Sequence, residues 1–141
     1  MAVRLIVHPS AEQDLDSLYE SDDEVDTDSA AEIETLLDEI QCNQKILSAM
    51  HRKGFRHLDR PAFDVDYFYE AFQKHQLQLS RLKIYDWEGS LVPYRVIFAY
   101  DHANEIIYVL AVVKRNIAYD TTGPIFDRIC TDYAGLGLAT N

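Results

Sequence analysis

Residues 79–119, LSRLKIYDWEGSLVPYRVIFAYDHANEIIYVLAVVKRNIAY, decide the fold of this chain. They contain three runs of strand length. In the first run apolar and polar residues alternate, and the next two runs are almost continuously apolar. Turn compositions separate the runs, with a glycine in residues 86–90 and Asp-His-Ala-Asn in residues 101–104. The pattern therefore predicts three consecutive antiparallel strands.

Two helices are predicted ahead of these strands. Residues 3–7 form a short apolar run typical of a strand. Ser10 then begins one capping box and Ser29 begins another, each with Glu or Gln three residues later. The acidic residues 22–28 between the two helices are predicted to be a solvated loop, because like charges repel. The second helix carries an apolar stripe and is predicted to end at Gly54.

Residues 55–78 are longer than an ordinary connection between a helix and a sheet, and we interpret them as an inserted segment. Phe68 and Phe72 favour a helix from about Val65 to His75, and a strand through residues 63–69 is the alternative. After the three strands, a final helix is predicted to start at a proline, Pro124.

The predicted fold is a single α+β domain over residues 1–141. It has an antiparallel sheet, an N-terminal helical hairpin, a C-terminal helix and the inserted segment at 55–78. A chain of this length can bury its own core. The expected core positions in the sheet are Leu82, Ile84, Val96, Phe98, Val109 and Ala111.

Each of the three predicted strands carries basic residues. Arg81 and Lys83 lie on the first, Arg95 opens the second, and Arg115 closes the third. An antiparallel sheet can bring such side chains together on one surface. A cluster of cations without obligate acidic partners suits the binding of a phosphate or a carboxylate.

The ordered set R-L-K-I-Y, Y-R-V-I-F-A-Y-D and I-Y-V-L-A-V-V-K-R, with a tyrosine four residues further on, resembles the RelE/ParE toxin superfamily. The resemblance covers the last two strands best and the N-terminal helices by order of elements. It implies a RelE-like fold. It also implies the toxin of a type II toxin–antitoxin pair, a metal-independent endoribonuclease that cleaves ribosome-bound mRNA and is held inactive by a cognate antitoxin.

The resemblance also implies roles for individual residues. Arg95 and Arg115 would hold the scissile phosphate, while Lys83 and Arg81 would add positive field and assist proton transfer. Tyr119 would be the base or a stacking platform for a nucleobase. No cofactor is implied.

Each of these residues also has a purely structural interpretation. Arg95 can pair with Asp86 or Asp101 at the strand ends, and Arg115 can belong to a solvated strand end. Trp87 lies in the turn after the first strand. It can pack its own loop, stack on a substrate base or anchor a partner.

The charge of the chain is unevenly distributed. The net charge is −11. Residues 1–50 hold 2 basic and 13 acidic side chains, whereas residues 51–141 hold 11 of each. This distribution argues against a general nucleic-acid binder and departs from the basic composition typical of RelE-like ribonucleases.

Other site classes find little support in the sequence. The five histidines have scattered spacings, so no metal site is predicted. Cys42 and Cys130 are expected to be buried thiols rather than a disulfide framework. No apolar run of bilayer length and no secretory signal is visible, so a cytoplasmic protein without membrane contact is expected.

Two alternatives to the ribonuclease remain open. A ParE-like toxin would act by binding a protein target such as DNA gyrase, and the acidic N-terminal half fits such a target better. A catalytically silent member of the same fold would serve as a binding module.

Overall fold

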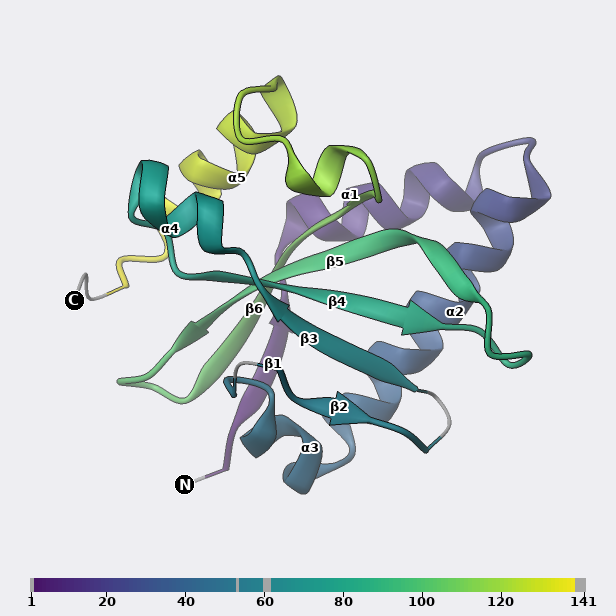
Figure 1. The fold of residues 1–141 in the computed structure, drawn as a ribbon, viewed down its shortest axis with the longest axis horizontal. Coiled ribbons are helices and arrows are strands. Elements are labelled where there is room, and N and C mark those ends of the chain that lie inside the picture. The colour runs from purple at the N-terminus through teal and green to yellow at the C-terminus, as the bar shows by residue number, and fades with distance from the viewer. Residues whose placement is uncertain (1, 53, 60–61, 139–141) are drawn as a thin grey trace.

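The computed structural model describes residues 2–52, 54–59 and 62–138, and for Tyr119 the backbone alone. Figure 1 shows a mixed sheet with helices on both faces. The strands are β1 (Arg4–Val7), β2 (Arg56–His57), β3 (Phe63–Tyr67), β4 (Leu79–Tyr85), β5 (Leu91–Asp101) and β6 (Ile106–Lys114). The helices are α1 (Pro9–Tyr19), α2 (Glu24–Gln41), α3 (Gln44–Ala49), α4 (Tyr69–His75), the 3₁₀ turn η1 (Ile117–Tyr119) and α5 (Pro124–Gly135).

The six strands form one sheet in the order β1-β6-β5-β4-β3-β2. The predicted antiparallel set β4-β5-β6 is confirmed, and β3 and β2 extend it with further antiparallel pairs. The sheet as a whole is mixed, because β1 runs parallel to β6 at the edge. Parallel neighbours need a long crossover connection, and here the chain from α1 to β5 lies between β1 and β6.

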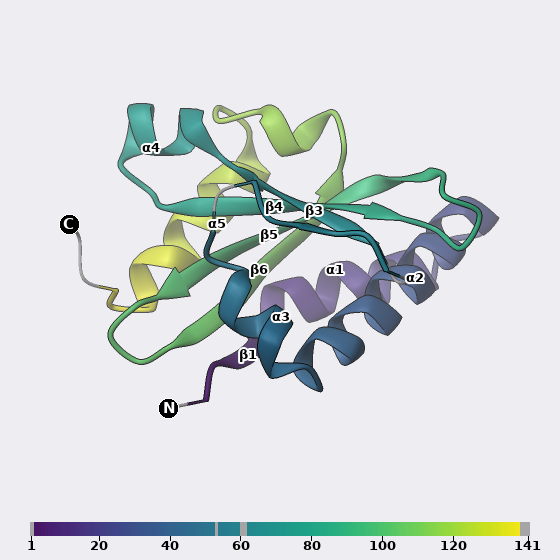
Figure 2. The same ribbon diagram turned by 60° about the horizontal axis from the view of Figure 1, so that its bottom comes forward.

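Two apolar cores cover the two faces of the sheet. In Figure 2, α2 and α3 lie on one side of the sheet and α4 on the other. The first core joins α1, α2 and α3 to one face, and the second joins α4, η1 and α5 to the opposite face. All the core positions expected in the sheet are buried, namely Leu82, Ile84, Val96, Phe98, Val109 and Ala111.

The predicted helix starts near the N-terminus were wrong. α1 begins at Pro9, and the Nδ1 atom of His8 accepts the backbone N–H of Ser10 at 3.1 Å. α2 begins inside the predicted acidic loop, where the carboxylate of Asp23 accepts the backbone N–H of Val25 at 2.9 Å. Acidic side chains favour a helix N-terminus, because they complement its dipole, and this effect outweighs their mutual repulsion. Ser29, the predicted cap, is therefore buried in the middle of α2.

The long second helix is interrupted after Gln41. The side chain of Asn43 accepts the backbone N–H groups of Lys45 and Ile46, so it caps a separate helix, α3. Cys42 lies at this break and is exposed, which corrects the expectation of a buried thiol. Cys130 lies partly buried in α5, where desolvation raises the pKa of its thiol.

The inserted segment combines both alternatives that its sequence allowed. Residues Phe63–Tyr67 form β3, and the helix α4 begins at Tyr69 rather than at Val65. Because side chains alternate along F-D-V-D-Y, Phe63 and Val65 are buried on one face of the sheet and Asp64 and Asp66 lie on the other face. The strand adds a row of acidic side chains beside β4.

In the part of the chain that the structure describes, no helix has both the length and the apolar character that a membrane crossing requires.

The C-terminal helix begins at Pro124, as predicted, with Gly123 at its N-cap.

Candidate functional site

The strand register places four predicted cations on one face of the sheet, which we call the cationic face: Arg81, Lys83, Arg95 and Arg115. Lys83 lies directly opposite Arg95, and Arg95 lies opposite Val113 on β6. Residues that are opposite each other in a sheet share a face, and so do residues two apart on one strand. Arg115 follows Val113 by two residues, and its backbone N–H continues the ladder to the oxygen of Pro93 at 2.9 Å.

Arg81 is buried and has a carboxylate partner. It is 6% exposed, and its Nη2 donates to the carboxylate of Asp66 at 2.9 Å. Its Nη1 donates to the carbonyl of Ala118 at 3.1 Å, and the guanidinium lies 4.3 Å from the ring centre of Phe68. The expectation that this cation lacks an acidic mate was wrong, because β3 supplies one directly opposite it.

Arg95 is buried without such a partner. It is 1% exposed, and its Nη1 donates to the carbonyls of Val92 and Tyr94 at 3.1 and 3.2 Å. Neither Asp86 nor Asp101 pairs with it. No described residue accepts from its Nε atom or places a carboxylate within 4 Å of it. A buried cation that meets carbonyl dipoles alone is costly, and it strengthens any attraction for a nearby anion.

Lys83 lies half-buried between Asp64 on β3 and Arg95 on β5. Asp64 already forms an ion pair with Arg56, whose Nε donates to it at 3.1 Å. It also accepts the hydroxyl of Tyr85 at 2.9 Å. The hydrogen bond to Asp64 is the main cause that raises the pKa of the Tyr85 phenol. Within the described residues, Lys83 itself has no carboxylate in ion-pair range.

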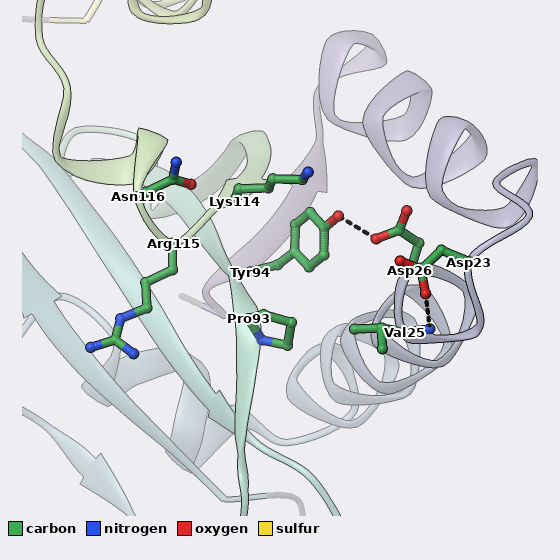
Figure 3. Close-up of a pocket in the computed structure, with 8 residues that line it drawn as sticks. All are labelled: Asp23, Val25, Asp26, Pro93, Tyr94, Lys114, Arg115 and Asn116. Atoms are coloured by element: carbon green, nitrogen blue, oxygen red, sulfur yellow. Dashed lines mark hydrogen bonds between the residues drawn. The ribbon is translucent and has the colours of Figure 1, made fainter.

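Arg115 is exposed and lines a pocket of about 630 Å³ where β5 starts and β6 ends. Figure 3 shows that its side chain points away from Tyr94 and Asp26, which line the same pocket. Lys114 lies opposite Tyr94 in the register and therefore faces the other side of the sheet from Arg115. The pocket thus wraps around the strand end, with Arg115 on the side of the cationic face.

Tyr94 and Asp26 form the central contact of this pocket, since the phenol donates to the carboxylate (Figure 3). Burial, followed by the contact with Asp26, raises the pKa of Tyr94 far above its ordinary value. The phenol therefore stays protonated at neutral pH and acts as a hydrogen-bond donor rather than a base. The same bond, together with one from Ser21 at 2.7 Å, lowers the pKa of Asp26.

This contact predicts a pH-dependent contribution to stability. Because the folded-state pKa of Asp26 lies below its ordinary value of 3.8, its contribution is complete above that value and is lost as the pH falls through the lowered pKa. The variant Tyr94→Phe should be less stable than wild type at pH 7, and the difference should shrink below about pH 4. Urea unfolding of both proteins between pH 3 and pH 7 measures it. A difference that grows on acidification would contradict the assignment.

Two further predicted residues have different outcomes. Trp87 is 68% exposed and lines a separate pocket beside Asp86, Glu88 and Glu32, so the structure does not bring it to the cationic face. The backbone of Tyr119 ends η1, but its side chain lies outside the described residues, and its predicted role as base or stacking platform stays a prediction.

Several residues of this region were not identified from the sequence. Asp66 pairs with Arg81 of the cationic face, Asp64 pairs with Arg56 beside it, and Asp26 and Tyr94 meet across 68 positions of sequence. The D-V-D alternation at 64–66 was a signal for the first two, because it has the period of a strand and matches R-L-K at 81–83. No local pattern links Asp26 to Tyr94.

Among the described residues, no group of three or more His, Cys, Asp or Glu side chains is arranged to hold a metal ion.

Comparisons of the chain with protein-family models, with curated proteins and with solved structures each gave no match.

Proposed function

We propose that this chain is the toxin of a type II toxin–antitoxin pair, with the arrangement and the mRNA-cleaving activity of RelE-like proteins. The order of elements supports the proposal: a first strand, the two helices α1 and α2 followed by the short α3, three antiparallel strands and a C-terminal helix. The segment from β2 to α4 is then an insertion at the far edge of the sheet from β1.

The observation that carries the proposal is the unbalanced charge of the cationic face. Arg81 is paired with Asp66, and Arg56 with Asp64. Lys83, Arg95 and Arg115 remain without a carboxylate in ion-pair range among the described residues. With adjacent strands about 4.8 Å apart, three such cations on neighbouring strands suit a phosphodiester.

The burial of each cation suggests a division of roles. Arg115, which is exposed, and Lys83, which is half-buried, would contact the phosphate. Arg95, which is 1% exposed, would stabilise the developing negative charge from beneath, through its field in a medium of low dielectric. Proton transfer falls to Lys83 and Tyr119 in this proposal, since the Tyr85 phenol has a raised pKa and keeps its proton at neutral pH.

The overall charge of −11 opposes tight binding of free RNA. In this proposal the ribosome therefore presents the mRNA, because its other contacts position the substrate. The cognate antitoxin is the second partner.

A ParE-like toxin that binds a protein such as DNA gyrase is the second candidate. It is favoured by the burial of Arg81 and Arg95, which keeps two of the four cations from direct contact with any substrate. The 13 acidic side chains in residues 1–50 also fit a protein target. A silent binding module of the same fold would show neither toxicity nor cleavage.

The test is induced expression of the chain with and without the neighbouring gene, followed by mapping of mRNA 5′ ends. We expect growth arrest that the neighbouring gene relieves, together with new 5′ ends inside translated regions. Growth arrest with DNA damage and intact mRNA would favour the ParE-like alternative. Unaffected growth would overturn the toxin assignment.

A further inference from the structure

A second pocket, of about 530 Å³, lies away from the cationic face. It is lined by the end of β3, the helix α4, the start of β4, the end of β5 and the segment after α3. Tyr67, Ser80 and Phe98 lie side by side in the strand register and share a face, and Phe98 belongs to the core beneath α2. The strand residues of the pocket therefore lie on the sheet face opposite to Arg95, whereas its wall from α4 comes from the other side of the sheet.

One wall of this pocket is a group of three aromatic rings. The rings of His51 and Tyr100 are stacked, with centroids 5.1 Å apart and an interplanar angle of 22°. His102 meets Tyr100 edge-on at 4.6 Å. His51 follows α3, Tyr100 lies near the end of β5 and His102 lies in the β5–β6 turn, so tertiary packing brings His51 to the other two.

The inserted segment supplies the other wall. Tyr67 lies at the end of β3, with Tyr69 at 6.2 Å and Phe72 at 6.5 Å between ring centroids. Tyr69 is 58% exposed and Phe72 is 39% exposed. Large aromatic side chains that line a pocket and remain accessible offer stacking surface to a ligand.

The pocket differs in charge from the one beside Arg115. The nine described residues that line it include no Lys, Arg, Asp or Glu. Burial is the main cause that raises the pKa values of Tyr67 and Tyr100, so these phenols stay neutral. A ligand cation would find no carboxylate among these residues, and a ligand anion no guanidinium or ammonium group.

We propose that this pocket binds a nucleobase, that is, a flat and uncharged heteroaromatic ring. Its volume lies in the range of small-ligand sites, and Ser80 and the two histidines supply polar atoms at an aromatic wall. Stacking on aromatic side chains is the main way in which proteins hold single bases. A free nucleoside and an unstacked base of RNA share this chemistry. The proposal does not depend on the ribonuclease assignment, because none of the described residues that line this pocket belongs to the cationic face.

The test is titration of the isotope-labelled full chain with adenosine and, separately, with a tetra-adenylate, followed by two-dimensional NMR. We expect saturable shifts of backbone amides at His51, Tyr100 and His102. The double variant Tyr69→Ala, Phe72→Ala should weaken binding about 5- to 100-fold, because it removes stacking surface. Tyr19→Ala is the matched control, since it removes a 43% exposed tyrosine on α1 and should leave binding unchanged.

The two probes distinguish the source of the base. Equal affinity for adenosine and tetra-adenylate would identify a free nucleoside as ligand, and tighter, salt-sensitive binding of tetra-adenylate would identify RNA. The proposal would be overturned if neither probe gave a saturable shift at concentrations up to about 10 mM, because any dissociation constant would then be weaker than the millimolar range. So would binding of choline without binding of adenosine, or unchanged affinity in the double variant.

Discussion

Replacing Arg115 by alanine is expected to reduce toxicity and mRNA cleavage about a hundred- to a thousandfold, the usual cost of losing one contact to a developing oxyanion. The free energy of unfolding should stay within about 0.5 kcal/mol of wild type, because the side chain is exposed. Growth after induction and quantified mRNA 5′ ends measure the first effect, and urea unfolding measures the second.

Arg4→Ala is the matched control for this experiment. It also removes an exposed arginine, but from β1, where Arg4 lies opposite Ile106 at the far end of β6 from Arg115. Its toxicity should equal that of wild type. Undiminished toxicity of Arg115→Ala would move the assignment to a toxin that binds a protein.

Arg95→Ala is a poorer test of function than Arg115→Ala. Arg95 is among the largest fully buried side chains, so its truncation leaves a cavity and changes stability as well as charge. Arg95→Met keeps most of the volume and removes the charge. It should lower cleavage while leaving stability equal or higher, because replacing a buried cation by an apolar side chain removes its desolvation cost.

The second large effect is expected from Asp66→Ala, which should lower the free energy of unfolding by about 2–3 kcal/mol. The substitution leaves the guanidinium of Arg81 buried without its carboxylate, and breaking a buried pair in this way usually costs about 3–5 kcal/mol. The expected loss is at the low end because the Asp66 side chain is 36% exposed, whereas that of Arg81 is 7% exposed. Equilibrium urea unfolding at pH 7 measures it.

Two companion variants identify the cause. In the double variant Asp66→Ala, Arg81→Met, most of the lost stability should return, since no unpaired charge remains buried. Arg56→Ala breaks the neighbouring pair with Asp64, and its effect should stay below about 1 kcal/mol because Arg56 is 67% exposed. A loss in Asp66→Ala that Arg81→Met fails to restore would show that Asp66 stabilises the fold in another way.

The sequence alone determined the strands β4, β5 and β6, the buried positions along them and the helix start at Pro124. Each of these features depends on local information, namely apolar periodicity, turn residues and the fixed backbone geometry of proline. The helix boundaries near residues 22–43 were predicted wrongly, although the relevant side chains are local. Several Asp, Ser and Asn residues there are all good caps, and helix–sheet packing selects among them.

Tertiary structure alone decided which cations are accessible. The sequence placed Arg81, Lys83 and Arg95 on strands in the correct order, and Arg115 follows directly after the last strand, β6. It did not show that Asp66 pairs with Arg81, or that α4 and η1 cover this guanidinium with Phe68 and Ala118. Burial of a strand residue depends on what packs above it, and here that is chain from distant positions. The same reason explains why Asp26 and Tyr94 meet, and why His51 stacks on Tyr100: such contacts arise from long-range packing, which leaves no periodic signal in the sequence.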